Sequence, residues 1–264
     1  MRLTNLSLAT FAWVILAFLA TPALVVLPLS LSSVRFFTFP PPGWSTRWYV
    51  NFLTAPDWQA AMLTSLGVGI ASTIISLILG TLAAMALVRT SFRGRNLLYA
   101  VLLSPLIMPT IILAIGLYFT FAPLGLLGSP IVVVIGHVIL ASPFVIVTMM
   151  TALERFDTSL ERAALSLGAH PLMAFWRVTF PVIKPSFFAA AFLAFLASFD
   201  DLLIALFLGG TRMRTIQLQM WQGIRFESDP TVAAASSFLM VLSLLVFVVV
   251  QAQSRRTLQN DSKA

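Results

Sequence analysis

Two adjacent carboxylates, Asp200 and Asp201, are the residue pair in this chain that most suggests chemistry. Paired carboxylates perform general acid–base catalysis when their pKa values differ and a substrate lies between them. Adjacent residues of a helix point about 100° apart, so these two side chains do not flank a common substrate. The pair therefore predicts no acid–base catalysis, and its role depends on the element that carries it.

The other candidates for chemistry are His137 and His170, and the chain contains no cysteine. Without cysteine there is no disulfide, thiol catalysis or cysteine metal site. Two histidines so far apart do not predict a metal cluster. We interpret His137 as a buried, hydrogen-bonded residue rather than a proton relay, and His170 as a turn residue. The sequence thus predicts no catalytic residue, no metal and no cofactor bound by this chain, and hence no enzyme.

The composition points to a membrane protein. Of the 264 residues, 59% are hydrophobic and 9% are charged, whereas about 25% of a soluble domain is charged. Residues 3–34, 58–88, 96–153 and 230–254 carry no charge. A bilayer core needs about 20 apolar residues for each helix. We therefore predict an all-α membrane protein whose single transmembrane domain covers residues 1–264.

We predict six membrane spans at about residues 8–31, 61–87, 97–121, 130–152, 185–208 and 231–252. Eleven lysines and arginines fall on the side that holds the termini, and five fall opposite. The positive-inside rule therefore places both termini in the cytoplasm. Residues 32–60 and 209–230 become periplasmic segments. The basic residues follow this topology, so the net charge of +7 does not indicate a nucleic-acid partner.

A charged segment, residues 153–184, separates the fourth and fifth predicted spans and is called the elbow below. Thr158 and Glu161 have the spacing of a capping box, in which each side chain bonds a free backbone amide. Gly168 stands where a helix ends in a left-handed residue. Pro171 is acceptable in the first turn of a second helix. Pro181 and Pro185 are expected to break that second helix before the fifth span.

Two interpretations of the elbow follow from these residues. Small Ala163 and Ala164 beside a glycine turn allow close approach of another surface, which indicates a compact cytoplasmic docking element. The aromatic residues Phe175 and Trp176, next to Arg177, are also compatible with a helix that lies on the membrane surface.

The elbow resembles the EAA loop of permease subunits in binding-protein-dependent ABC importers. That loop contains Glu-Ala-Ala, a later glycine and a terminal proline. The matches here are Ala163, Ala164, Gly168 and Pro181, while Arg162 takes the position of the motif's glutamate and Glu161 precedes it. The resemblance implies an ATPase-coupling loop whose candidate residues are Glu161, Ala163, Ala164, Gly168 and Pro181.

The resemblance extends to FPPPGWSTRWYVNFL (39–53), LLSPLIMPTIILAIGL (102–117), ASFDDLLIALFLGG (197–210) and IRFESDPTVAAAS (224–236). These stretches look like the polyamine (spermidine/putrescine) branch of type I importers. The resemblance implies the MetI-like permease architecture in a bacterial inner membrane. It also implies two ATP-binding subunits, a solute-binding protein outside, and a second permease subunit, identical or different, of which the branch resemblance favours a different chain. The chain lacks the GxxxxGK[ST] phosphate loop, so ATP and Mg²⁺ would be used by the partner ATPase.

Asp200 and Asp201 lie inside the predicted span 185–208. An ionised aspartate at mid-bilayer costs about 2.5–3.5 kcal/mol on insertion scales. Our hypothesis is that one lines the translocation pathway and attracts a cationic solute, while the other makes a structural hydrogen bond. Helix packing or gating is the alternative role for both.

The function expected is an ATP-driven importer subunit for a small solute, with a polyamine as the expected substrate. The alternative is an ion-coupled secondary transporter of a small cationic solute. Such transporters commonly contain inverted repeats and broken helices near a midplane site, and they need no cytoplasmic docking element.

Overall fold

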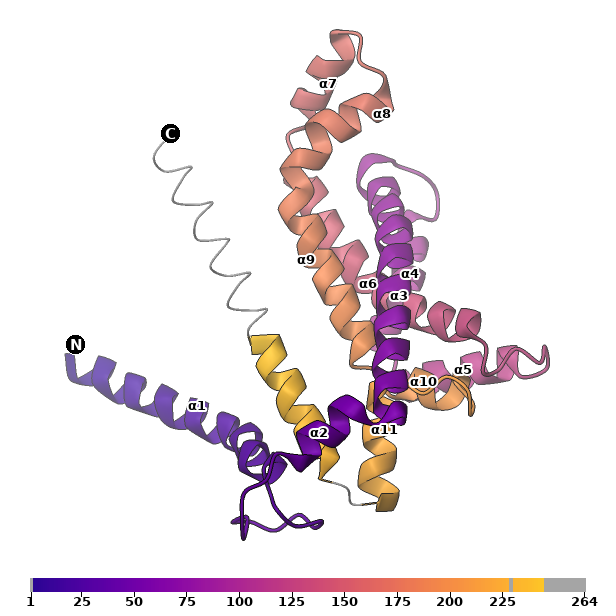
Figure 1. Ribbon diagram of the computed structural model, residues 1–264. Coiled ribbons are helices and arrows are strands. Elements are labelled where there is room, and N and C mark those ends of the chain that lie inside the picture. The colour runs from indigo at the N-terminus through magenta and orange to yellow at the C-terminus, as the bar shows by residue number, and fades with distance from the viewer. Residues whose placement is uncertain (1, 228–229, 245–264) are drawn as a thin grey trace. The chain divides into compact units, whose positions relative to one another are not determined.

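The computed structural model describes residues 2–227 and 230–244, and most of these are helical (Figure 1). The chain divides into two compact units. The larger unit consists of residues 60–219, and the smaller one combines residues from 1–59 and from 220–264. All the residues predicted to form functional sites belong to the larger unit.

The larger unit is built from helices of very different length. The long ones are α3 (Pro56–Arg89), which begins in the smaller unit, α6 (Pro130–Glu154) and α9 (Phe180–Phe199). The shorter ones are α4 (Arg95–Ile107), α5 (Thr110–Phe121), α7 (Thr158–Ser166), α8 (Pro171–Ala174), α10 (Leu203–Leu208) and α11 (Ile216–Gln222). One turn of π-helix, η1 (Phe175–Thr179), joins α8 to α9.

A core of small and aliphatic side chains holds α3, α6 and α9 together. Its buried members are Leu77, Ala84, Ala141, Val145, Met149, Leu153, Ile183, Ala190 and Ala194. Lipid is as apolar as leucine, so helices in a bilayer associate through close packing that small residues permit. At Gly80 the helices α3 and α6 approach closely, because a Cβ atom there would lie 2.8 Å from Cγ1 of Val145.

The third predicted span, 97–121, is two helices rather than one. The helices α4 and α5 meet at an angle of 108°. Pro109 lacks the amide hydrogen that a continuous helix requires, and a proline disfavours helical backbone at the residue before it. Met108 accordingly has extended backbone, with φ −74° and ψ 134°. The break is therefore a local consequence of one proline.

The fifth predicted span, 185–208, is interrupted as well. Helix α9 ends at Phe199, and the short helix α10 begins at Leu203. Helix α10 packs against α5 and α6 through a second core that includes Val68, Ala114, Val133 and Ile204. The two aspartates thus lie between helices rather than in the middle of one.

Four helices in the described part of the chain are long and apolar enough to cross a membrane, or five if α4 and α5 form one bent span. For the sixth predicted span, 231–252, the structure describes a helix at Thr231–Leu244, and residues 245–252 lie outside the described residues. The same holds for Arg255, Arg256 and Lys263, which contributed to the predicted topology.

The smaller unit contains α1 (Arg2–Ser30), α2 (Arg47–Thr54), the π-helical turn η2 (Gly223–Glu227) and the helix Thr231–Leu244. Nε1 of Trp48 donates a hydrogen bond to the Ser32 carbonyl at 2.7 Å. Nδ2 of Asn51 donates to Oγ1 of Thr231 at 2.9 Å. These bonds connect α2 to a residue that precedes it in the chain and to one that follows it.

The close contact at Gly80 gives a stability prediction. In Gly80→Ala the added Cβ atom meets Val145 and must push α3 from α6, and overpacking of this kind costs about 1–3 kcal/mol. Gly67→Ala is the matched control on the same helix, because a Cβ atom there has no neighbour within 4 Å. Alanine favours a helix over glycine by about 1 kcal/mol. Thermal unfolding of the purified protein in detergent should rank Gly67→Ala above Gly80→Ala, and the reverse order would contradict this packing.

Candidate functional site

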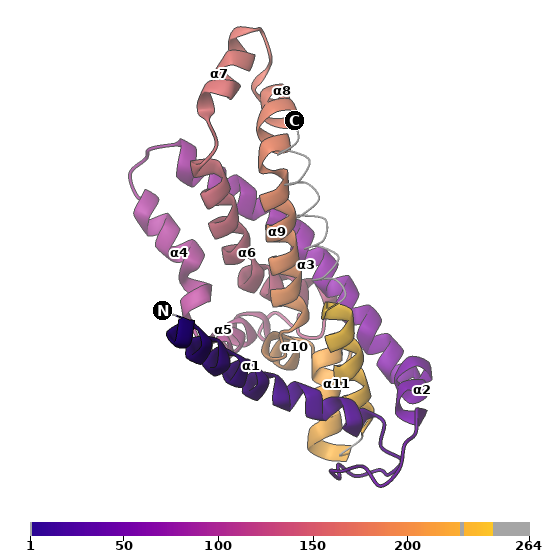
Figure 2. The same ribbon diagram turned by 90° about the vertical axis from the view of Figure 1, so that its left-hand side faces the viewer.

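The elbow projects from the larger unit. Figures 1 and 2 both show α7 and α8 beyond the end of α6, at the end of the long helical run that contains α9. No residue of α7 is buried. The helix therefore presents its side chains to the surroundings instead of to a core.

Helix α7 begins one residue earlier than the capping box predicts. Its N-cap is Asp157, whose carboxylate accepts a hydrogen bond from the Ser159 backbone N–H at 2.9 Å. This bond lowers the pKa of Asp157, so the cap is charged at neutral pH. The prediction that Thr158 and Glu161 form a capping box is wrong, because a carboxylate on the preceding residue already caps the first turn.

Gly168 ends α7 as predicted. Its φ of +89° is left-handed, a conformation that glycine adopts without steric cost. The Gly168 amide bonds the Leu165 carbonyl, and the Ala169 amide bonds the Ala164 carbonyl. This pair of bonds is the Schellman motif, which satisfies carbonyls at the end of a helix. His170 is the N-cap of α8, and its Nδ1 accepts from the Leu172 amide at 3.4 Å.

Pro181 and Pro185 do not break the second elbow helix, contrary to the sequence prediction. A single apolar helical run extends through α8, η1 and α9 from Pro171 to Phe199. Pro181 cannot donate a bond to the carbonyl four residues earlier, and its ring crowds that carbonyl. The wider π-turn immediately before it, closed by a bond from the Phe180 amide to the Phe175 carbonyl, accommodates both effects.

Glu161 points toward the base of the elbow. Its Oε1 accepts a hydrogen bond from Nη1 of Arg89 at 2.9 Å, and its Oε2 lies 2.7 Å from Nη2 of the same guanidinium. Oγ1 of Thr179 donates to Oε2 at 3.0 Å. The carboxylate therefore joins α7 to the end of α3 and to η1.

The elbow exposes several large apolar side chains. Leu167 is 89% exposed, Leu172 is 62% exposed and Trp176 is 56% exposed. Ala163 is exposed and Ala164 is half-buried. Small residues and exposed large apolar ones on a projecting hairpin are typical of a surface that a partner covers.

The two aspartates have different surroundings. Asp201 is half-buried, and its Oδ2 accepts a hydrogen bond from the Ile204 backbone N–H at 2.7 Å, in the first turn of α10. Asp200 is exposed, and its Oδ1 accepts a bond from Nε2 of Gln217 at 3.3 Å. Asp201 thus bonds the first turn of α10, while Asp200 is exposed, and a pathway role for either aspartate stays a prediction.

A buried chain of polar side chains crosses the helix core, and only one of its members was predicted from the sequence. His137 is buried, as predicted, and its Nδ1 lies 3.0 Å from Oγ of Ser198. Oγ of Ser72 lies 2.8 Å from the same hydroxyl. These residues belong to α6, α9 and α3. Ser72 and Ser198 carry no sequence signal, because isolated serines are common in membrane helices.

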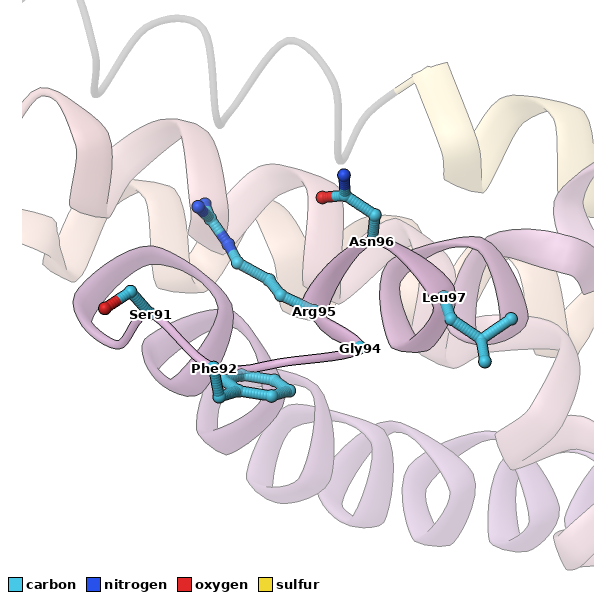
Figure 3. A pocket seen from close by; sticks show the side chains of 6 residues that line it. All are labelled: Ser91, Phe92, Gly94, Arg95, Asn96 and Leu97. Carbon is cyan, nitrogen blue, oxygen red and sulfur yellow. The ribbon is translucent and has the colours of Figure 1, made fainter.

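A shallow hollow of about 330 Å³ lies at the connection between α3 and α4. Figure 3 shows the side chains that line it, which are Ser91, Phe92, Gly94, Arg95, Asn96 and Leu97. All six residues are exposed. The hollow contains none of the predicted site residues.

Apolar helices of membrane-spanning length and a projecting helical elbow define a multi-pass membrane protein with a docking element. The chain belongs to the family described as binding-protein-dependent transport system inner membrane component, whose sequence model matches residues 76–259. It is thus a permease subunit of a binding-protein-dependent ABC importer in the inner membrane. This membership does not favour the alternative of an ion-coupled secondary transporter.

Curated relatives cover most of the chain. It is 33% identical to the putrescine transport system permease protein PotI of Escherichia coli, over 84% of this chain and 82% of that one. It is 29% identical to the spermidine/putrescine transport system permease protein PotC of Escherichia coli, over 93% and 92%. It is 28% identical to the molybdenum transport system permease protein ModB of Mycobacterium tuberculosis, over 95% and 97%.

Solved structures support the fold. A chain of a bacterial ABC transporter that imports the acidic polysaccharide alginate matches with a TM-score of 0.75 at 20% identity, over 95% of this chain and 96% of that one. A chain of the methionine ABC transporter MetNI matches with a TM-score of 0.53 at 19% identity, over 75% and 91%. The predicted fold class, an importer permease of MetI-like architecture, is confirmed.

The bond from Asp201 to α10 gives a second prediction. In Asp201→Ala the Ile204 amide loses its acceptor, and loss of a side-chain cap costs about 0.5–2 kcal/mol. Asp201→Asn keeps an acceptor oxygen at the same place and is the matched control. Thermal unfolding in detergent should show a lower Tm for Asp201→Ala than for Asp201→Asn, and equal values would assign Asp201 no capping role.

Proposed function

We propose that this chain is a permease subunit that carries a polyamine such as putrescine or spermidine into the cell. A solute-binding protein delivers the substrate from outside, and two ATP-binding subunits dock on the cytoplasmic elbow. The observation that carries the proposal is the elbow itself, an exposed hairpin with an apolar tip at the EAA-like residues Ala163, Ala164 and Gly168. Because the sequence has no phosphate loop, ATP and Mg²⁺ are used by the partner ATPase, and this chain is not catalytic.

The continuity of α9 supports a mechanical link between the elbow and the pathway. Helix α9 has 20 residues and is about 30 Å long at 1.5 Å per residue. It begins directly after η1 and ends directly before Asp200. A displacement of the elbow by the ATPase therefore reaches the aspartate region through one rigid element. Such coupling requires that the ATP-bound and ATP-free partners prefer different permease conformations.

The choice of a polyamine rests on relatives and on one carboxylate. PotI and PotC are named as permeases for putrescine and for spermidine/putrescine, whereas ModB is named for molybdenum. Polyamines are multivalent cations at neutral pH. The exposed carboxylate of Asp200 attracts such a cation, and Gln217 beside it supplies a further polar group.

The remaining partners follow from the same proposal. Long helices with exposed leucine, isoleucine and phenylalanine side chains need lipid or another chain around them, and a second, different permease subunit is proposed to cover part of this surface. The segments 32–60 and 209–230 face outward to the binding protein. Both termini lie in the cytoplasm of the bacterium.

The docking role of the elbow is tested at Gly168. Gly168→Val places a β-branched side chain at φ +89°, and left-handed backbone costs an ordinary residue about 1–2 kcal/mol. Gly168→Asn is the matched control, because asparagine tolerates this conformation. The ATPase should co-purify with Gly168→Asn at a ratio close to that of the original chain and should be lost or strongly reduced with Gly168→Val. Full retention by both variants would remove the docking role from this turn.

The pathway role is tested at Asp200. Asp200→Asn removes a charge from a contact with a cation, and hydrogen bonds to charged groups contribute about 1.5–3 kcal/mol, so uptake of labelled putrescine or spermidine should fall roughly tenfold or more. Arg93→Gln, which removes an exposed charge outside both the outward-facing segments and the elbow, is the control. Unchanged uptake by Asp200→Asn in a normally assembled complex would remove the substrate role.

A further inference from the structure

The end of α3 is bound to the elbow although the two are far apart in sequence. Arg89 is the last residue of α3, and Glu161 lies 72 positions later in α7. Helix α7 follows α6 in the chain and precedes α8, so its covalent neighbours do not include α3. The contact between Arg89 and Glu161 therefore links the elbow directly to α3, a helix to which the elbow is not joined by a short chain connection.

The geometry of this bridge restricts movement. Both carboxylate oxygens of Glu161 face the guanidinium group, at 2.9 Å and 2.7 Å, and Thr179 adds a third contact at 3.0 Å. One charge-assisted hydrogen bond together with a second close contact between the same two groups restricts orientation as well as distance. Lysine cannot reproduce it, because its ammonium group is a point charge on a flexible stem.

The two ends of the bridge differ in how firmly they are held. Leu87, two residues before Arg89, is fully buried in a core with Leu103 and Ile146, so Arg89 extends from a rigid helix end. Helix α7 has no buried residue. The Arg89 and Glu161 side chains are only 24% and 16% exposed, and among the described residues theirs is the one ion pair. Helix α7 thus depends on polar contacts, rather than on buried apolar side chains of its own, for its attachment to α3.

We infer that Arg89 and Glu161 are positioning residues that make α3 move together with the elbow, so that ATP hydrolysis is converted into transport. This inference rests on the proposed docking of the ATPase on the elbow. The chain passes a displacement of the elbow to α6 and α9 by covalent connection, and the bridge passes it to α3. All three helices of the main core then shift as one body. Without the bridge, only the apolar core links α3 to the helices that move with the elbow.

The loss of the bridge should uncouple the importer without dismantling it. The exposed tip that meets the ATPase, including Leu167 and Gly168, does not involve the Arg89 and Glu161 side chains. Assembly and ATP hydrolysis should therefore persist, while the amount of solute carried for each ATP falls. Coupling free energies between sites typically correspond to factors of about 5–150, so a fall of at least about fivefold is expected.

The experiment uses the complete importer in proteoliposomes, with its ATPase, its binding protein and labelled putrescine. The quantity measured is putrescine transported per ATP hydrolysed, together with the ATPase retained on purification. The test variants are Arg89→Gln, Glu161→Gln and the charge swap R89E/E161R. Arg93→Gln and Arg95→Gln are matched controls, because both residues are exposed, lie close to Arg89 in sequence and stand outside the elbow.

We expect the ratio to fall at least about fivefold in both single variants, to recover in the swap, and to stay unchanged in the controls. Recovery is possible because the hydroxyl of Thr179 can accept a bond from arginine as readily as it donates one to glutamate. A ratio within about twofold of the original importer in both single variants would overturn the inference. A swap that is as uncoupled as the single variants would also overturn it.

If the single variants do not assemble, Thr179→Val provides the test, because it removes one of the three contacts and leaves the ion pair. A smaller fall in the same ratio supports the inference, and an unchanged ratio overturns it. Failure of the proposed function is distinguishable, since the original chain would then bind no ATPase at all. An importer that assembles and couples normally in every variant contradicts the positioning role alone.

Discussion

A bilayer offers no water to a helix, so every backbone group that a break releases has to find a partner inside the protein. In the membrane-spanning part of the chain, this constraint accounts for the contacts at the interruption between α9 and α10. Asp201 accepts a bond from the first turn of α10, where α9 has ended. In the elbow, the π-turn η1 widens the helix directly before Pro181, which has no amide hydrogen to donate. The interruption after α9 and the π-turn thus each have a specific local cause, and the interruption between α9 and α10 leaves Asp200 exposed.

Because charged residues are few, each charged contact shows which helices are held in a specific relation. Where most of a surface is apolar, a carboxylate with three contacts, such as Glu161 with Arg89 and Thr179, holds specific elements in a specific relation. The buried chain of His137, Ser198 and Ser72 does this for α6, α9 and α3 deeper in the core. Polar contacts between helices thus fix which residues of neighbouring helices face each other, which uniform apolar packing does not.

Local sequence patterns predicted the elbow well because its signals are local. A glycine that must adopt positive φ needs no tertiary context, and Gly168 behaves as expected. The errors also have local causes. Asp157 is as good a cap as Thr158 and comes first, and the effect of Pro181 depends on whether the preceding turn can widen. Hydropathy alone gave no warning of the bends, because α4 and α5 are apolar on both sides of Pro109.

The sequence by itself determined that this protein lies in a membrane and that it is helical. It also determined the family resemblance and the position of the elbow. All four follow from composition and from spacings of a few residues. Only the tertiary structure decided which charges are engaged. Whether Glu161 faces a partner or Arg89, and whether Asp200 or Asp201 is tied to a helix end, depends on contacts between residues far apart in the chain. Such contacts leave no periodic trace in a single sequence, because one suitable side chain at one position is enough to make them.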